Sequence, residues 1–249
     1  MSARLAALDH VLGLVARSGC VDTLVLRGST TMAAWFGDRA REPGDLDFVV
    51  RPGAAEGARP WRASAVGAPR PHDAVLKLVE EHPSAGWVRL HPADAVHGRS
   101  YGYYPGGART VMPFSSDDGS GGTVQLDFAY DESLPEPPVL TAVPRYGGGT
   151  PHALWTASPA LSLVWKLQWL IADHAERGVV GGKDLYDAVL LASLDGLVVP
   201  PRLRRLVDRD ALGALPGWAV DGHPSVAGSA GTWLSRLSAA LRVLDLDGA

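Results

Sequence analysis

The sequence predicts an α+β protein, in which helices pack against a mixed β-sheet and a helical C-terminal part follows. A strand, a helix and a second strand fit between residues 23 and 50, and strand-like segments recur up to residue 130. From residue 153 onward, the apolar residues recur at helical spacing. We therefore expect two domains, residues 1–150 with mixed structure and residues 151–249 with helical structure.

The first predicted element is an amphipathic helix that ends at Gly19. Residues 23–26 form a short apolar strand, and Ser29 is placed to cap a helix that Gly37 closes. Residues 46–50 form the next strand. The other predicted elements are a loop at 51–70, a helix at 73–81, strands at 87–91, 110–114 and 123–130, a hairpin loop at 115–122 and a connection at 131–152.

Helices dominate the prediction for the C-terminal part. Ser158 is an N-cap, and Pro159 occupies the first helical position, where its missing N–H is not needed. Gly178 ends this helix, and Gly181-Gly182 separates it from the next one. The predicted helices cover residues 158–177, 183–194, 201–209 and 229–244.

The composition is that of a soluble globular protein. Of 249 residues, 46% are hydrophobic and 20% are charged, which excludes general disorder. The net charge of −4 provides no global basic field for nucleic acid or membrane surfaces. Cys20, the single cysteine, excludes an internal disulfide and a thiolate zinc cluster. Because no apolar run approaches ~20 residues and no signal-peptide core precedes the fold, we expect a cytoplasmic protein without a membrane partner.

Three aspartates form the strongest chemical signal. Asp45 and Asp47 are two residues apart on a predicted strand, so their carboxylates share one face. Asp127 lies within a second apolar strand, where a lone charge would be costly. A shared Mg²⁺ would relieve both problems, because carboxylate oxygens are the ligands it prefers. The alternative for the first pair is a strand end with two solvated carboxylates.

Two further groups of residues point to phosphate chemistry. Gly28 and Ser29 close a strand and open a helix, where free N–H groups and the positive helix end favour a phosphate; an ordinary N-cap is the alternative. Lysine occurs only at positions 77, 166 and 183 in a chain with 23 basic residues. Two antiparallel helices would bring Lys166 close to the segment 183–187. The alternative for Lys166 is a side chain that snorkels from an amphipathic helix.

These residues together resemble the nucleotidyltransferase fold of the DNA polymerase β superfamily. The segments 26–32 and 41–48 look like a strand, a Gly-Ser turn and a helix followed by the D-[IL]-D-F motif. The segment 158–167 and the K-D-L-Y-D sequence at 183–187 are similar to the helical motif of the AbiEii/MenT type, the toxins of type IV toxin–antitoxin systems. Pro43 stands where that family usually has Ser or Thr, and Arg27 stands where it often has Lys.

The resemblance implies a role for each candidate residue. The catalytic group would be Asp45, Asp47, Asp127, Lys166 and Asp184, of which the first three would hold two Mg²⁺ ions. The nucleotide-binding group would be Arg27, Gly28, Ser29, Lys183 and Asp187. In this scheme residues 1–150 are the catalytic domain, and residues 151–249 contribute to the active site.

The implied reaction moves a nucleoside monophosphate from an NTP to an acceptor hydroxyl, with a tRNA 3′ end as the acceptor and an antitoxin protein as a partner. Transfer to a small molecule is one alternative, which the net charge of −4 favours. A nucleotide-binding module without catalysis is another. The local basic run of Arg202, Arg204, Arg205 and Arg209 could contact RNA phosphates, but the net charge of −4 favours a solvated helix face.

Overall fold

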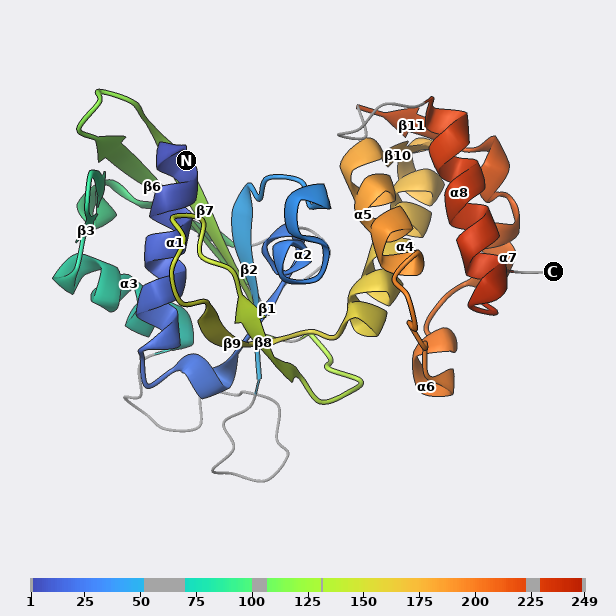
Figure 1. The fold of residues 1–249 in the computed structure, drawn as a ribbon, viewed down its shortest axis with the longest axis horizontal. Helices are drawn as coiled ribbons and strands as arrows, with labels where there is room; N and C mark the ends of the chain where they lie inside the picture. Colours follow the sequence, from blue (N-terminus) through green and yellow to red (C-terminus); the bar gives the residue numbers. More distant parts are fainter. Residues whose placement is uncertain (1, 52–69, 100–106, 131, 223–228, 248–249) are drawn as a thin grey trace. The chain divides into compact units, whose positions relative to one another are not determined.

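The computed structural model describes residues 2–51, 70–99, 107–130, 132–222 and 229–247 (Figure 1). The predicted fold class is confirmed: the chain combines a mixed sheet with helices. It divides into two compact units, Met1–Ala157 and Ser158–Ala249. The first unit runs past residue 150 because a strand at His152–Thr156 belongs to its sheet.

A mixed sheet, nine-stranded over the described residues, forms the centre of the first unit (Figure 1). Its order is β3-β4-β6-β7-β2-β1-β9-β8, and β5 pairs with β6. Two neighbouring pairs, β2 with β7 and β1 with β9, are parallel, and the other pairs are antiparallel. The strands are β1 (Leu24–Arg27), β2 (Asp45–Val50), β3 (Ser84–Ala85), β4 (Val88–Leu90), β5 (Val96–Arg99), β6 (Ala108–Ser116), β7 (Gly121–Ala129), β8 (Val139–Val143) and β9 (His152–Thr156).

One face of this sheet packs against α1 (Ala3–Ala16) and α3 (Pro71–Glu81). Phe48 of β2 and Phe128 of β7 stack with ring centroids 5.4 Å apart, in the same buried cluster as Leu8 and Leu12 of α1. Side chains alternate between the two faces along a strand. The aspartates next to these phenylalanines therefore point to the opposite face.

The helix α2 (Ser29–Phe36) follows β1 directly and ends at Gly37, as predicted. The prediction that Ser29 caps this helix is wrong, because Gly28 is the N-cap and Ser29 is already the first helical residue. The backbone turns at Gly28 with φ 78°, a conformation that glycine adopts without steric cost. The side chain of Ser29 is therefore not used as a cap.

Two other predictions for the first unit differ from the structure, and a third lies mostly outside the described residues. The connection predicted at 131–152 contains β8, an edge strand on which Leu140 is 63% exposed, so the strand shows little apolar alternation. Residues 153–156, predicted to begin the helical part, belong to β9. Of the predicted loop at 51–70, residues 52–69 lie outside the described part of the chain.

The second unit contains five helices within its described residues: α4 (Pro159–Arg177), α5 (Gly182–Ala192), α6 (Pro201–Arg204), α7 (Arg209–Gly213) and α8 (Ala230–Val243). The Oγ of Ser158 accepts a hydrogen bond from the Leu161 amide at 3.0 Å, and Gly178 ends α4 with φ 70°, both as predicted. The prediction of an all-helical part is wrong, because β10 (Val179–Gly181) pairs with β11 (Ala219–Asp221). Strands this short show no periodicity. None of the described helices is both long and apolar enough to cross a membrane.

Candidate active site

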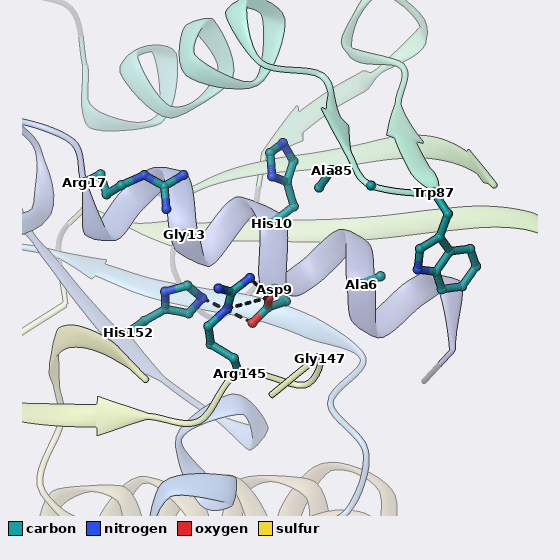
Figure 2. Close-up of a pocket in the computed structure, with 11 residues that line it drawn as sticks. Ala6, Asp9, His10, Gly13, Arg17, Ala85, Trp87, Arg145, Gly147 and His152 are labelled. Atoms are coloured by element: carbon teal, nitrogen blue, oxygen red, sulfur yellow. Dashed lines mark hydrogen bonds and ion pairs between the residues drawn. The ribbon is translucent and has the colours of Figure 1, made fainter. Parts of the chain in front are cut away.

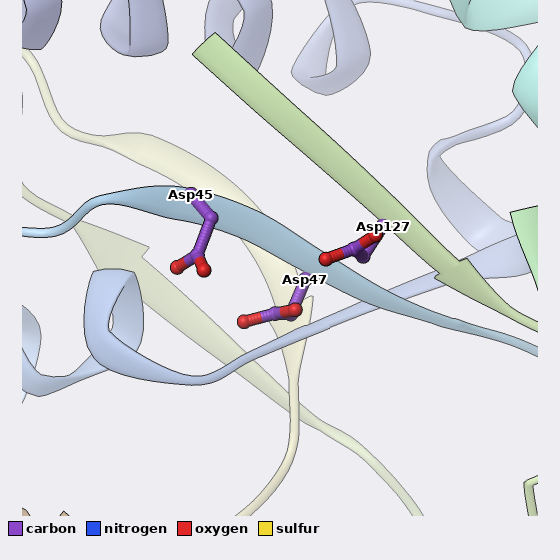
Figure 3. Close-up of side chains that lie close together, drawn as sticks. All are labelled: Asp45, Asp47 and Asp127. Atoms are coloured by element: carbon purple, nitrogen blue, oxygen red, sulfur yellow. The ribbon is translucent and has the colours of Figure 1, made fainter. Parts of the chain in front are cut away.

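Three carboxylates meet on one face of the first unit's sheet (Figure 3). Asp45 and Asp47 project from β2, and Asp127 projects from the neighbouring strand β7, directly opposite Asp47 in the parallel register. One ligand oxygen from each of the three lies within 4.8 Å of the others. We call these residues the acidic cluster. Like charges at this separation repel, and a hard divalent cation would remove the repulsion.

Asp127 is not the lone buried charge that the sequence indicated. The guanidinium of Arg109 on β6 holds its carboxylate in a fork, with Nε 2.7 Å from Oδ1 and Nη2 2.8 Å from Oδ2. The amide nitrogen of Gln125 donates to Oδ2 at 2.8 Å. The negative charge of Asp127 is thus compensated without a metal ion. Its oxygens keep further lone pairs that could bind a metal, because each oxygen can accept more than one bond.

Arg109 completes a row of charges across four adjacent strands. Arg27 of β1 lies opposite Asp47 of β2, which lies opposite Asp127 of β7, which lies opposite Arg109 of β6. We call these four residues the charge row. Arg109 was not predicted from the sequence, although the predicted hairpin loop at 115–122 indicates that the strands on either side of it pair. Counting back from its turn pairs residue 109 with residue 127.

Arg27, predicted to neutralise nucleotide phosphates, is buried and forms an ion pair with Glu132. The side chains of the two residues are 9% and 3% exposed. Glu132 follows β7 in a segment whose sequence showed no pattern, so it was not predicted. The pair fixes the guanidinium of Arg27 at the end of the charge row.

Gly28 and Ser29 lie against the acidic cluster. A Cβ atom on Gly28 would meet the Oδ2 of Asp47 at 2.6 Å, so any other residue would displace this carboxylate. Ser29 is 2% exposed, and its Oγ has no hydrogen-bond partner among the described residues. A buried hydroxyl without a partner is costly. This hydroxyl at the start of α2, together with an all-oxygen donor set, fits a site for Mg²⁺ and a phosphate-bearing ligand.

A second polar cluster lies within the second unit. The Nζ of Lys166 on α4 is 2.6 Å from Asp184 Oδ1 and 3.1 Å from Asp187 Oδ2, both on α5. It also lies 5.0 Å from the ring centroid of Trp169. Lys166 is 5% exposed and Asp187 is fully buried, so the snorkelling alternative for Lys166 is wrong. The predicted proximity of these helices is confirmed, whereas Lys183 is exposed to solvent.

The mixed sheet, the glycine-serine turn and the three carboxylates define a class of enzyme, the nucleotidyltransferases. The family model described as nucleotidyl transferase AbiEii toxin, type IV TA system, matches residues 12–214. The chain therefore belongs to the AbiEii family of nucleotidyltransferase toxins, which supports an enzyme rather than a binding module without catalysis.

Two solved structures are similar to the chain, and the first of them shares its fold. A crystal structure of a candidate nucleotidyltransferase from H. pylori has 15% sequence identity and a TM-score of 0.56, and the match covers 96% of each chain. An antigenic nucleotidyltransferase-like protein from Paracoccidioides brasiliensis has 14% identity and a TM-score of 0.43 over 80% of this chain and 85% of its own. No curated protein matches the sequence.

The first prediction concerns Arg109. We expect Arg109→Met to lower the free energy of unfolding in metal-free buffer by on the order of 3 kcal/mol, because it removes one partner of a buried pair. Saturating Mg²⁺ should raise the unfolding temperature of this variant more than that of the wild type, since the cation restores the missing positive charge. Calorimetry with and without Mg²⁺ measures both effects. Arg89→Gln, an exposed change on β4, is the control; an equal Mg²⁺ effect in all three proteins would contradict the prediction.

The second prediction concerns Lys166. Lys166→Met should cost about 3 to 5 kcal/mol of stability, because two carboxylates are left without their cation. Adding Asp187→Asn removes one of these charges and should recover most of the loss in chemical denaturation. The single variant Asp187→Asn controls for the second change, and Lys77→Ala, an exposed lysine, should have little effect. If the double variant is no more stable than Lys166→Met, the two side chains are not electrostatically coupled as described.

Proposed function

We propose that this nucleotidyltransferase is Mg²⁺-dependent and transfers a nucleoside monophosphate from an NTP to the 3′ end of a tRNA. The observation that carries the Mg²⁺ assignment is the acidic cluster, in which three carboxylates lie together beside the start of a helix. Bound Mg²⁺ ions would supply charge neutralisation for the triphosphate and would lower the pKa of the acceptor hydroxyl. Asp45, Asp47 and Asp127 are the residues proposed to hold two such ions.

The other residues of the first unit are proposed to bind and orient the nucleotide. The Oγ of Ser29 and the free amides at the start of α2 would donate hydrogen bonds to phosphate oxygens. Gly28 permits this approach, because it has no side chain beside Asp47. Arg27 would add positive charge next to the phosphates while Glu132 fixes its orientation. Arg109 would hold the Asp127 carboxylate in place, as a positioning residue.

Lys166 is proposed to stabilise the negative charge that develops on the phosphates during transfer. The proposal is supported by its environment: an ammonium group held by Asp184 and Asp187 at fixed distances needs little reorganisation. In this scheme Asp184 is a positioning residue for Lys166, and the exposed Lys183 would bind the nucleotide. Asp187, predicted to bind the nucleotide, is fully buried against Lys166 and would also act by positioning it. A purely structural salt bridge between α4 and α5 would instead make activity follow stability in the Lys166 variants.

Two kinds of acceptor are compared, a tRNA and a small molecule. The resemblance of the 158–167 and 183–187 segments to the AbiEii/MenT type favours tRNA, and the match to a type IV toxin family makes a cognate antitoxin the expected protein partner. A small-molecule acceptor is favoured by the net charge of −4. In addition, Arg204 and Arg209 from the basic run are engaged by Asp245, at 2.7 and 3.0 Å, which reduces the positive charge they offer to RNA.

The test is to incubate the protein with Mg²⁺ and each α-labelled NTP, with and without bulk tRNA. We expect label to enter tRNA with one or a few of the nucleotides, and Asp47→Asn to lower the rate by ~10²-fold or more, because a group that stabilises transition-state charge is lost. Lys77→Ala is the matched control outside both clusters. Label that stays out of tRNA but enters a small-molecule pool would favour the alternative acceptor. Transfer by Asp47→Asn at the wild-type rate would contradict the metal assignment.

A further inference from the structure

A second polar site lies in the first unit, away from the acidic cluster. A cavity of about 280 Å³ runs along α1 and is lined by polar side chains from α1 and from the segments before and within β9 (Figure 2). The residues that line this cavity include Asp9, His10, Gly13, Arg17, Arg145 and His152. The helix α1 packs on the face of the sheet opposite to the three carboxylates. An occupant of this cavity is therefore separated from the acidic cluster by the sheet.

Asp9 organises one wall of this cavity, as Figure 2 shows. Its Oδ1 lies 3.2 Å from His152 Nε2, and its Oδ2 accepts from both Nε and Nη2 of Arg145 at 3.2 Å. Burial alone would raise the pKa of the Asp9 carboxyl, but the contacts with His152 and Arg145 outweigh burial and lower it. Asp9 is therefore ionised, and it holds the imidazole and the guanidinium in fixed positions.

Gly13 allows the side chains of His152 and Arg17 to approach α1 closely. A Cβ atom at this position would lie 3.1 Å from Cε1 of His152 and 3.2 Å from Nη1 of Arg17, so both side chains converge on the place that a methyl group would fill. Glycine in the middle of a helix costs roughly 0.5–1 kcal/mol relative to alanine. A side chain at position 13 would therefore displace His152 or Arg17, both of which line the cavity.

The charges around the space favour an anion. Two guanidinium groups, of Arg17 and Arg145, line the cavity with one carboxylate, that of Asp9. Two imidazoles add further hydrogen-bonding capacity. The Nε2 of His10 lies 2.6 Å from the His82 carbonyl oxygen, an acceptor, so Nε2 carries the hydrogen. Even with both histidines neutral, the cavity wall has a net positive charge.

We propose that this cavity binds a phosphate group, either as inorganic phosphate or as the phosphomonoester of a small molecule, between the guanidinium groups of Arg17 and Arg145 and beside His152. Donors that approach from different side chains suit a tetrahedral oxyanion, whereas one guanidinium fork would suffice for a planar carboxylate. The volume, near the lower end for ligand cavities, accommodates a small phosphorylated molecule. The proposal is independent of the transfer reaction.

The experiment titrates the full-length, metal-free protein with inorganic phosphate, and separately with ribose 5-phosphate, by isothermal calorimetry at constant ionic strength. The wild type should bind both ligands in competition with each other. We expect Arg17→Gln to weaken phosphate binding about tenfold, since one charge-assisted contact is lost. Gly13→Ala should weaken it as well, because the methyl group would displace Arg17 and His152. Tighter binding of ribose 5-phosphate would identify a phosphomonoester as the ligand, and tighter inorganic phosphate would identify the free ion.

Two controls separate this site from other positions. Arg89→Gln removes an exposed arginine outside the cavity, and Asp47→Asn alters the acidic cluster; both should bind phosphate as the wild type does. Circular dichroism checks that each variant is folded, and Arg17→Gln provides the test if Gly13→Ala does not fold. The proposal is overturned if the wild type binds no phosphate, if neither cavity variant weakens binding, or if Asp47→Asn abolishes it. If Asp47→Asn loses nucleotide transfer but still binds phosphate, the result supports a phosphate site that is separate from the acidic cluster.

Discussion

The parallel register between β2 and β7, which sets Asp47 opposite Asp127, is the constraint on which the site depends. The same register places Phe48 opposite Phe128 on the other face of the sheet. A slip by one residue would move the aspartates into the apolar core and expose the phenylalanines. The hydrophobic packing against α1 therefore fixes where the three carboxylates meet, although none of the packing residues takes part in the chemistry.

Bringing three carboxylates together has an electrostatic cost, and the neighbouring strands offset part of it. Arg109 and Arg27 flank the two aspartates in the charge row, and Arg109 binds Asp127 directly. Gly28 contributes through the absence of a side chain, because a Cβ atom would reach the Asp47 carboxylate. The carboxylates are thus flanked by positive charge on both sides before any cation binds, which would preserve their geometry for the proposed metal and nucleotide.

The sequence was informative where residues act through local spacing. The i, i+2 spacing of Asp45 and Asp47 on a strand, and the glycine-serine turn that follows β1, could be identified directly. The approach of Lys166 to Asp184 also followed from two helices joined by a short break. Arg109 was missed because its role depends on cross-strand pairing, which hydrophobic periodicity does not report. Short or exposed strands such as β8 and β10 were missed for a related reason: too few of their residues are buried to produce a pattern.

The cavity beside Asp9 is another feature that could not be predicted from the sequence. Its residues come from α1 and from the segments around β9, more than a hundred residues apart in the chain, and only the folded sheet brings them together. Gly13 gave no signal in the sequence, because a single glycine within a helical pattern is compatible with ordinary packing. The close approach of His152 and Arg17 to this position becomes visible only in the folded structure.

The central claim is that the acidic cluster is a divalent-cation site. Anomalous diffraction from crystals soaked in Mn²⁺, which has the same preference for oxygen ligands, tests this most directly. We expect an anomalous peak within coordination distance of Asp45, Asp47 and Asp127, and its loss in Asp47→Asn crystals soaked in the same way. A peak elsewhere only, or none at these carboxylates at saturating Mn²⁺, would contradict it.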